Sequence, residues 1–378
     1  MKNGTSIPLS LPLNSSEATL ELVGGKGASL AKMAAAGLPV PPGFHLTTAA
    51  YRLFVEANHI QEPIIDAAAG ASTDDPSSLE RASAAIRSLF DRGAMPEVVA
   101  TSICRAYAAM GEGELAVAVR SSATAEDLPE MSFAGQQETF LNVRGELALL
   151  EAVRRCWASL WTARAIGYRL RMGVDSGAVA MGVVVQAMAL AETSGVLFTA
   201  NPTTGDRSEL VINANFGLGE SVVGGQVTPD SYIVDKSNIA LKQVSVGTKE
   251  SMVIPADGQG TSVQAVAESR RAEQALSPNL LHELSELAMR VEQLYEGVPQ
   301  DIEWAVAGDR CWLLQARPMT ALRPAPLRDV RWEPPTPGSG WIRRQVVENM
   351  PEPLSPLFAE LYLEGLERSA VAMQAAMG

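Results

Sequence analysis

Apolar residues recur at helical spacing through much of the first half of the chain. With caps and helix-breaking residues taken into account, the pattern predicts helices over 47–59, 78–92, 95–110 and 146–171. Another helix is expected to begin after the glycines of segment 24–27. The prolines of segment 38–43 end it, because proline lacks a backbone N–H and has a restricted φ.

Short apolar runs bounded by glycine, proline or asparagine predict strands. They lie at 115–120, 183–188, 195–199, 210–214, 302–306 and 311–316. The last two flank Gly308 and Asp309, which are typical of a β-hairpin turn. The mixture predicts an α+β or α/β fold with two lobes.

Proline is frequent toward the C-terminal end of the sequence. The segment 321–340 is rich in proline and predicts a linker, because few of its residues can join a helix or a ladder of strands. The segment 341–378 is too short to bury a core of its own. We therefore expect it to be the incomplete start of a further domain.

Composition narrows the classes of function. The 378 residues include 30 basic and 43 acidic side chains, a formal net charge of −13, so we expect neither nucleic acid nor an anionic membrane as a partner. A small anion would need a local basic pocket. The three cysteines lack metal-ligand spacing, and the N-terminus lacks the apolar segment of a secretion signal, so a cytoplasmic protein is expected.

Two basic residues lie in settings that suit an anion. Lys26 lies among Gly24, Gly25 and Gly27 before a predicted helix, where free backbone N–H groups and the helix dipole favour negative charge. Arg120 ends a predicted strand and precedes a hydroxyl-rich loop, so its guanidinium could bind phosphate oxygens. The structural alternatives are a solvated loop for Lys26, and for Arg120 an ion pair with the acidic residues at 126 and 127.

Three further positions are candidates for ligand contact. Gly135 would let the backbone approach a ligand closely, and Thr139 offers a hydroxyl, although both also suit an ordinary loop before a strand. Gln186 lies inside a predicted buried strand. Its amide must be hydrogen-bonded, either within the fold or to a ligand.

The predicted hairpin brings the most chemistry together. With a three-residue turn, Glu303 lies opposite Gln315, and Arg317 joins them on the same face. A carboxylate and an amide oxygen suit Mg²⁺, and a guanidinium suits phosphate. The structural alternative is a Glu303–Arg317 ion pair on a wet sheet face. A two-residue turn would separate Glu303 from Gln315 and remove this argument.

Several long motifs, in order, resemble one enzyme superfamily. They are GGKGASL at 24–30, GLPVPPGF at 37–44, VRSSATAEDLP at 119–129, SFAGQQET at 132–139, FGLGE at 216–220 and LQARP at 314–318. They resemble the ATP-binding half of the phosphoenolpyruvate synthase, pyruvate phosphate dikinase and rifampicin phosphotransferase superfamily. The resemblance implies an α+β ATP-grasp fold that binds ATP between two lobes, 1–185 and 186–320.

The resemblance also implies a role for each candidate. Lys26, Arg120 and Arg317 would contact phosphates and serve catalysis, and Glu303 and Gln315 would hold Mg²⁺. Gly135 and Thr139 would belong to a loop over the phosphates. Gln186 would lie near the adenine and ribose, with Asn213 and Glu220 as weaker candidates for contact.

In such enzymes the β-phosphoryl group of ATP passes to a histidine on a separate swivelling domain and then to a small-molecule acceptor. Here no histidine lies in the expected carrier context, so that domain would have to act in cis beyond this chain or in trans. The tail, with WIRR at 341–344 and VENMPEPLSPLF at 347–358, resembles the acceptor-binding domain of rifampicin phosphotransferase-like proteins. Two other hypotheses are an ATP-grasp ligase that activates a carboxylate and a non-catalytic nucleotide-binding module.

Overall fold

The computed structural model describes residues 7–111, 113–124, 139–320 and 322. Contacts divide the chain into two units, Met1–Ala325 and Pro326–Gly378. The fold described below is that of the first unit. The predicted linker, apart from Leu322, and the segment 341–378 lie outside the described residues, as does Gly135.

The first sheet has five strands in the order β1-β2-β5-β3-β4, and neighbouring strands pair antiparallel. Its strands are β1 (Ser10–Pro12), β2 (Gly43–Leu46), β3 (Val117–Ala123), β4 (Thr139–Val143) and β5 (Met181–Ala187). Val183 and Val185 face one core, whereas Val184 between them faces another, as the alternation of side chains along a strand requires. The sheet is therefore covered on both sides.

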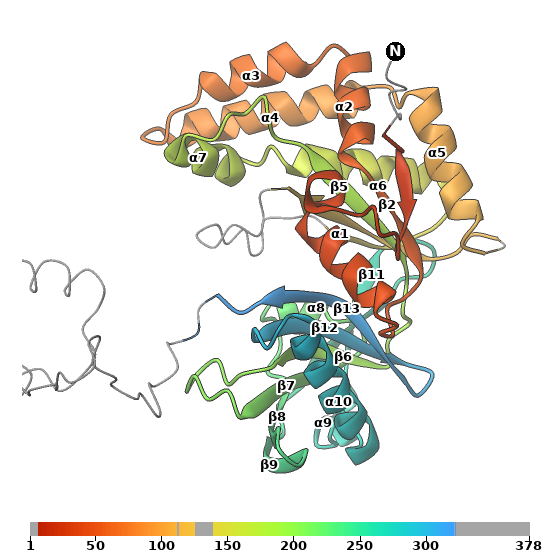
Figure 1. The fold of residues 1–378 in the computed structure, drawn as a ribbon, viewed down its shortest axis with the longest axis vertical. Helices are drawn as coiled ribbons and strands as arrows, with labels where there is room; N and C mark the ends of the chain where they lie inside the picture. The colour runs from red at the N-terminus through yellow and green to blue at the C-terminus, as the bar shows by residue number, and fades with distance from the viewer. Residues whose placement is uncertain (1–6, 112, 125–138, 321, 323–378) are drawn as a thin grey trace, which may run out of the picture. The chain divides into compact units, whose positions relative to one another are not determined.

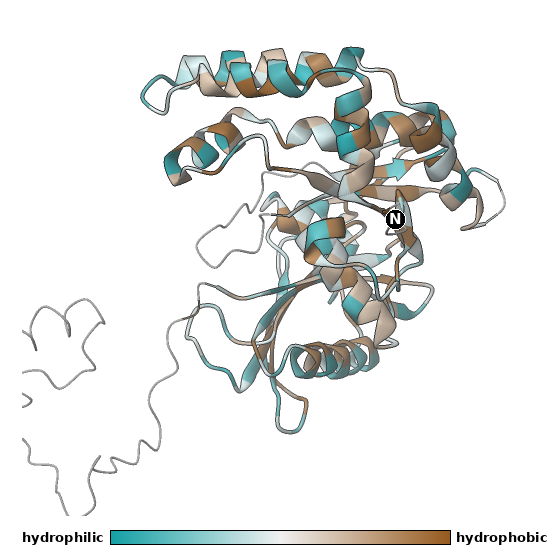
Figure 2. Cartoon of the chain, turned by 45° about the horizontal axis from the view of Figure 1, so that its top comes forward, coloured by the Kyte–Doolittle hydropathy of each residue, from teal (hydrophilic) through white to brown (hydrophobic). Residues whose placement is uncertain are grey.

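Six helices supply the first core. They are α2 (Thr48–Ala57), α3 (Gln61–Ala69), α4 (Pro76–Arg92), α5 (Glu97–Ala108), α6 (Glu146–Ser159) and α7 (Ala163–Met172). Their apolar faces form one core that includes Trp157, whose ring centroid lies 5.2 Å from that of Phe54. Figure 2 shows hydrophilic and hydrophobic residues side by side along these helices, as expected where one helix face is buried and the other is exposed.

Helix α1 (Leu20–Ala35) links the two halves of this unit (Figure 1). It contacts β3 and β5 of the first sheet and also β13 of the second, and its Leu30 and Met33 belong to the second core. The helix is interrupted at Gly24, which has φ +74°. A Cβ there would lie 2.1 Å from the carbonyl oxygen of Ser122, so only glycine fits against β3.

The second sheet has six antiparallel strands in the order β13-β12-β6-β7-β8-β9. They are β6 (Thr193–Phe198), β7 (Glu209–Phe216), β8 (Asp230–Asp235), β9 (Ala240–Ser245), β12 (Gln300–Ala307) and β13 (Arg310–Pro318). Helix α10 (Pro278–Leu294) contacts β12 and β13 and supplies apolar residues to the second core. The remaining elements are α8 (Glu220–Val223), α9 (Glu268–Arg271) and a two-stranded hairpin of β10 (Ser251–Pro255) and β11 (Thr261–Ala265).

The α+β prediction is confirmed, and the predicted helices and strands are found with shifted bounds. The helix predicted over 146–171 is two helices, because Leu160–Thr162 separates α6 from α7. The strand predicted at 115–120 runs on to Ala123, into the expected loop. The expected lobe boundary after residue 185 falls inside β5, whose Gln186 still pairs with Gly43 and Ala118 of the first sheet.

The hairpin of β12 and β13 differs from its prediction at the turn. Ala307 pairs with Arg310, so the turn has two residues rather than three. A register shift at Glu303/Trp304 then skips Leu314 and restores the pairing of Glu303 with Gln315. Because of the two-residue turn, Cys311 and Leu313 lie opposite Val306 and Trp304 and face the core with them.

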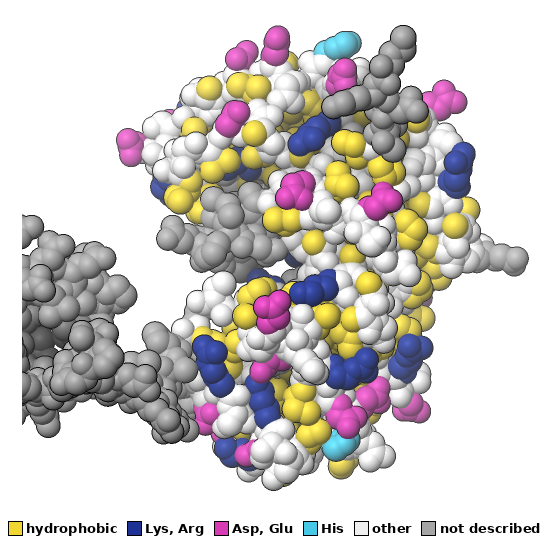
Figure 3. Space-filling view, in the orientation of Figure 1, with side chains coloured by type: hydrophobic (Ala, Val, Ile, Leu, Met, Phe, Trp, Pro, Cys, Tyr) yellow, Lys and Arg dark blue, Asp and Glu magenta, His cyan; other side chains and the backbone are white. Residues whose placement is uncertain are grey.

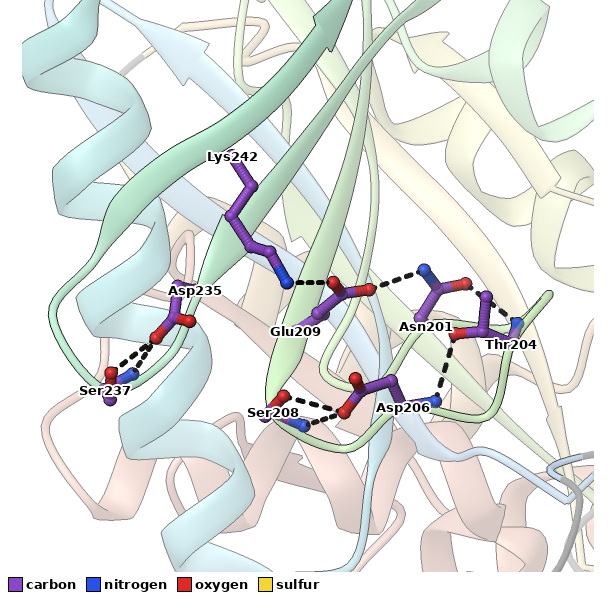
Figure 4. A network of polar contacts seen from close by, with 8 residues as sticks. All are labelled: Asn201, Thr204, Asp206, Ser208, Glu209, Asp235, Ser237 and Lys242. Carbon is purple, nitrogen blue, oxygen red and sulfur yellow. Dashed lines mark hydrogen bonds and ion pairs between the residues drawn. The ribbon is translucent and has the colours of Figure 1, made fainter.

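Local polar contacts organise the loops at one end of the second sheet (Figure 4). The Asn201 side chain accepts hydrogen bonds from the backbone N–H groups of Thr203 and Thr204 and donates one to Glu209, 2.8 Å away. Glu209 also pairs with Lys242. The carboxylate of Glu209 is therefore already used within the fold.

Candidate functional site

The candidate site begins at the restored pair Glu303 and Gln315. These two residues lie on the face of the hairpin opposite the apolar face of Ile302 and Trp304. Gln315 is only 6% exposed, yet its Oε1 atom has no hydrogen-bond partner among the described residues. Buried polar atoms are usually hydrogen-bonded, so this amide oxygen is a candidate for contact with a ligand.

Arg120 reaches this pair from the first sheet. Its Nη2 donates to a Glu303 carboxylate oxygen, and its Nη1 donates to the carbonyl oxygen of Leu314 over 2.7 Å. Leu314 is the residue that the register shift skips, so the irregularity also supplies an acceptor for Arg120. The predicted alternative partners at 126 and 127 lie outside the described residues.

Helix α1 brings Lys26 to the same place. Its Nζ lies 3.5 Å from the Ser121 carbonyl oxygen, and its charge acts on Glu303. One turn further along the helix, the Ser29 hydroxyl donates to the Ala316 carbonyl oxygen at 2.7 Å and lies 2.6 Å from the Tyr295 hydroxyl. These contacts hold the Lys26 helix against the strand of Gln315.

The Gly27 N–H is not one of the free N–H groups expected around Lys26. Gly24, Gly25 and Gly27 are buried, and the Gly27 N–H donates to the Ser122 hydroxyl over 3.0 Å. The glycines allow α1 to pack closely on β3. An anion at this place would therefore not be bound by the Gly27 N–H.

Arg317 also lies near the site, but its partner is not the predicted Glu303. Its Nε and Nη2 donate to one oxygen of Asp301 at 2.9 and 2.7 Å, across the same two strands. Burial raises the pKa of Asp301, and the charge of Arg317 offsets only part of that effect. Asp301 was missed in the sequence, although its position two residues before Glu303 on the same strand places both carboxylates on one face.

Charge balance keeps Glu303 ionised. Burial by itself would raise the pKa of this carboxyl group, but Arg120, followed by Lys26 and Arg317, lowers it below its ordinary value of 4.5. Three cations therefore act on one partly buried carboxylate, whose side chain is 23% exposed. The arrangement has surplus positive charge, which suits an anionic ligand.

The other candidates lie on β4, β5, β7 and α8. Thr139 begins β4, is exposed and pairs with Arg120 of β3. Gln186 is buried and its Nε2 donates to the Pro41 carbonyl oxygen over 3.3 Å, so the fold itself satisfies this donor. Asn213 lies on β7, and Glu220 is the first residue of α8.

The surface charge, the possible metal ligands and the helix lengths add three observations. On the face shown in Figure 3, lysine and arginine side chains gather mainly over the lower half, where the second sheet lies in Figure 1. Within the described part of the chain, no group of three or more His, Cys, Asp or Glu side chains is placed to hold a metal ion. None of the described helices is both long enough and apolar enough to cross a membrane.

Two large sheets, with a cationic cluster between β3 and the β12–β13 hairpin, suit a protein that binds nucleotides. Residues 20–332 match the family model described as "Pyruvate phosphate dikinase, AMP/ATP-binding domain". The chain belongs to this family, and the family predicted from the motifs is confirmed.

Named relatives agree with the family assignment. The chain is 44% identical over 353 residues to a probable phosphoenolpyruvate synthase of Pyrococcus abyssi, with 82% of this chain and 43% of that protein covered. It is 42% identical over 311 residues to a rifampicin phosphotransferase of Streptomyces sviceus, with 82% of this chain and 35% of that protein covered. The chain thus spans less than half the length of these relatives, and both kinds of relative match at similar identity.

Proposed function

We propose that residues 20–320 form an ATP-grasp unit that binds MgATP between its two lobes. The observation that carries this proposal is the meeting of Lys26, Arg120 and Arg317 with the Glu303–Gln315 pair. Cations bind the phosphates in this proposal, with Arg120 offering a planar pair of donors and Lys26 a point charge. Gly135 and Thr139 would cover the phosphates, and Gln186 would lie near the adenine and ribose.

The donor set also suits Mg²⁺. Glu303 offers a carboxylate kept ionised by its neighbours, and Gln315 offers an amide oxygen that no described residue hydrogen-bonds. Hard oxygen ligands are those that Mg²⁺ prefers, with waters and phosphate oxygens completing its shell. When bound, the metal would neutralise phosphate charge that Lys26, Arg120 and Arg317 do not reach.

In this proposal the chain serves a phosphotransferase of the dikinase type. The β-phosphoryl group would pass to a histidine of a separate carrier domain and from there to a small-molecule acceptor such as pyruvate or a rifampicin-like antibiotic. If water takes the γ-phosphoryl group, AMP and phosphate remain; if phosphate takes it, AMP and pyrophosphate remain. The residues of this chain would hold the phosphates in line, which is the main protein contribution to such transfers.

Binding tests the first half of the proposal. Calorimetric titration with a non-hydrolysable ATP analogue should show binding that strengthens with Mg²⁺. Glu303→Gln should weaken the Mg²⁺-dependent part by about 10- to 100-fold, the size typical of damage to a metal site. Glu292→Gln is the matched control, because Glu292 forms a similarly buried ion pair with Lys236 in the same lobe. Equal behaviour of the two variants, or no binding by the wild type, would refute the proposed site.

A phosphoryl-transfer assay tests the second part of the proposal, the reaction of the dikinase type. With a histidine carrier domain supplied in trans, label from the β-phosphate of ATP should appear on that domain and AMP should form. Release of ADP that depends on an added carboxylic acid, without a carrier, would instead identify a ligase. Binding without either reaction would identify a nucleotide-binding module.

A further inference from the structure

Asn142 has an unusual position in β4. It is fully buried and has φ +53°, a left-handed conformation that asparagine tolerates better than most residues. The pairing of β3 with β4 is irregular here, since Val117 lies opposite Val143 whereas Val119 lies opposite Phe140. Such a bulge re-aims a side chain out of the regular alternation.

The side chain contacts the turn of the β10–β11 hairpin, residues 256–260, which we call the hairpin tip. Its Nδ2 lies 3.0 Å from the carbonyl oxygens of both Ala256 and Gly260, and its backbone carbonyl accepts from the Gly260 N–H at 3.2 Å. Its Oδ1 accepts from the Arg144 Nε at 3.0 Å. Both the Nδ2 and the Oδ1 of this buried side chain therefore form hydrogen bonds.

The other end of this hairpin is attached to the second sheet. The Leu218 N–H donates to the Val253 carbonyl oxygen at 2.7 Å, and the Asn215 side chain donates to the Ser251 carbonyl oxygen at 3.0 Å. Gly217 has φ +75°, and a Cβ there would lie 2.3 Å from the Val253 oxygen. The hairpin thus runs from the glycine turn after β7 to β4 of the first sheet.

We propose that Asn142 is a positioning residue for the proposed nucleotide site: it fixes the hairpin tip to β4 and so couples the second sheet to the strand pair that carries Arg120. The coupling runs through backbone pairing, because β4 residue Thr139 lies opposite Arg120 on β3. The hydrogen bonds of the Asn142 side chain go to the hairpin tip and to Arg144, and to none of the five site residues. The part of this inference that concerns nucleotide affinity rests on the proposed function.

Two variants of the full chain test the coupling. Asn142→Asp keeps the shape but places a carboxylate against two carbonyl oxygens, and Asn142→Gly keeps the left-handed backbone without the side chain. The matched control is Asn58→Asp. Asn58 also donates to two carbonyl oxygens, those of Phe54 and Ala94, but it joins α2 to the segment after α4.

Hydrogen exchange gives a readout that needs no nucleotide. Exchange should rise together at the hairpin tip and in β3 and β4 of both Asn142 variants, and in neither place in Asn58→Asp. A rise confined to the hairpin tip would overturn the coupling. This outcome is decided whether or not the wild type binds ATP, so failure of the proposed function stays distinguishable.

Affinity gives the second readout. We expect both Asn142 variants to weaken MgATP binding about 5- to 150-fold, the range typical of coupled sites, and to change adenosine binding much less. This difference reports on the phosphate end, where Arg120 lies. Wild-type affinity for MgATP in variants with a loosened hairpin, or equal losses for ATP and adenosine, would overturn the positioning role.

Discussion

His45 makes a sharp prediction about acid stability. It lies on β2, fully buried, with Nε2 3.0 Å from the Leu13 carbonyl oxygen and with no partner for Nδ1 in the described part of the chain. Burial lowers the pKa of His45 from 6.5 to about 4. The imidazole is therefore neutral in the folded protein over a range of pH in which it is charged in the unfolded chain.

The sign and the size of the effect follow from this difference. The contribution of neutral His45 to the free energy of unfolding is fully present above pH 6.5. It is lost as pH falls toward 4, because His45 of the unfolded chain takes up a proton first. Linkage gives a loss of about 2 kcal/mol by pH 5 and about 3 kcal/mol by pH 4. These amounts are a large part of the stability of an ordinary domain.

Urea unfolding measured at half-unit steps between pH 7 and 4.5 tests the prediction. His45→Gln keeps a neutral donor for the Leu13 carbonyl oxygen, so its free energy of unfolding should fall less steeply with acid than that of the wild type. His282→Gln should match the wild type, because the His282 side chain is 57% exposed. Identical slopes for wild type and His45→Gln across this range would refute the reasoning.

Two further predictions concern packing and buried charge. Gly24→Ala should destabilise the unit by about 3 kcal/mol or more, because the new Cβ meets the Ser122 backbone. Gly37→Ala has a similar φ of +69° but open space around the new Cβ, so it should cost only about 1–2 kcal/mol. Equal losses of the two variants in thermal unfolding would contradict the contact argument. Lys249→Met should destabilise by about 3–5 kcal/mol, because it leaves the fully buried Asp230 carboxylate without its cation, and chemical unfolding with no loss would show that this ion pair is not needed.

The sequence alone predicted which residues form the candidate site but not how they contact one another. Lys26, Arg120, Glu303 and Gln315 do meet, although 183 positions separate Arg120 from its partner Glu303. Their chemical types and flanking motifs are local properties of the sequence. Their mutual contacts depend on how α1 and β3 pack on the hairpin, which no local pattern encodes.

The β12–β13 hairpin shows most clearly what the sequence alone does not predict. A two-residue turn is what Gly308 and Asp309 favour, and taken alone it would have separated Glu303 from Gln315. The bulge at Leu314 reverses that effect. A bulge has no reliable sequence signature, because its cost is met by contacts that form only in the folded molecule, here the bond from Arg120.

The amino-acid sequence by itself determined the family, the mixture of helices and strands, and the chemical types of the site residues, because motifs, periodicity and side-chain chemistry are carried by neighbouring residues. Only the tertiary structure decided that Arg317 pairs with Asp301, that the Gly27 N–H is bonded to Ser122 and that Asn142 joins β4 to the β10–β11 hairpin. Each of these results depends on packing between elements far apart in the chain. Such packing is selected by the free energy of the whole fold and not by any one segment.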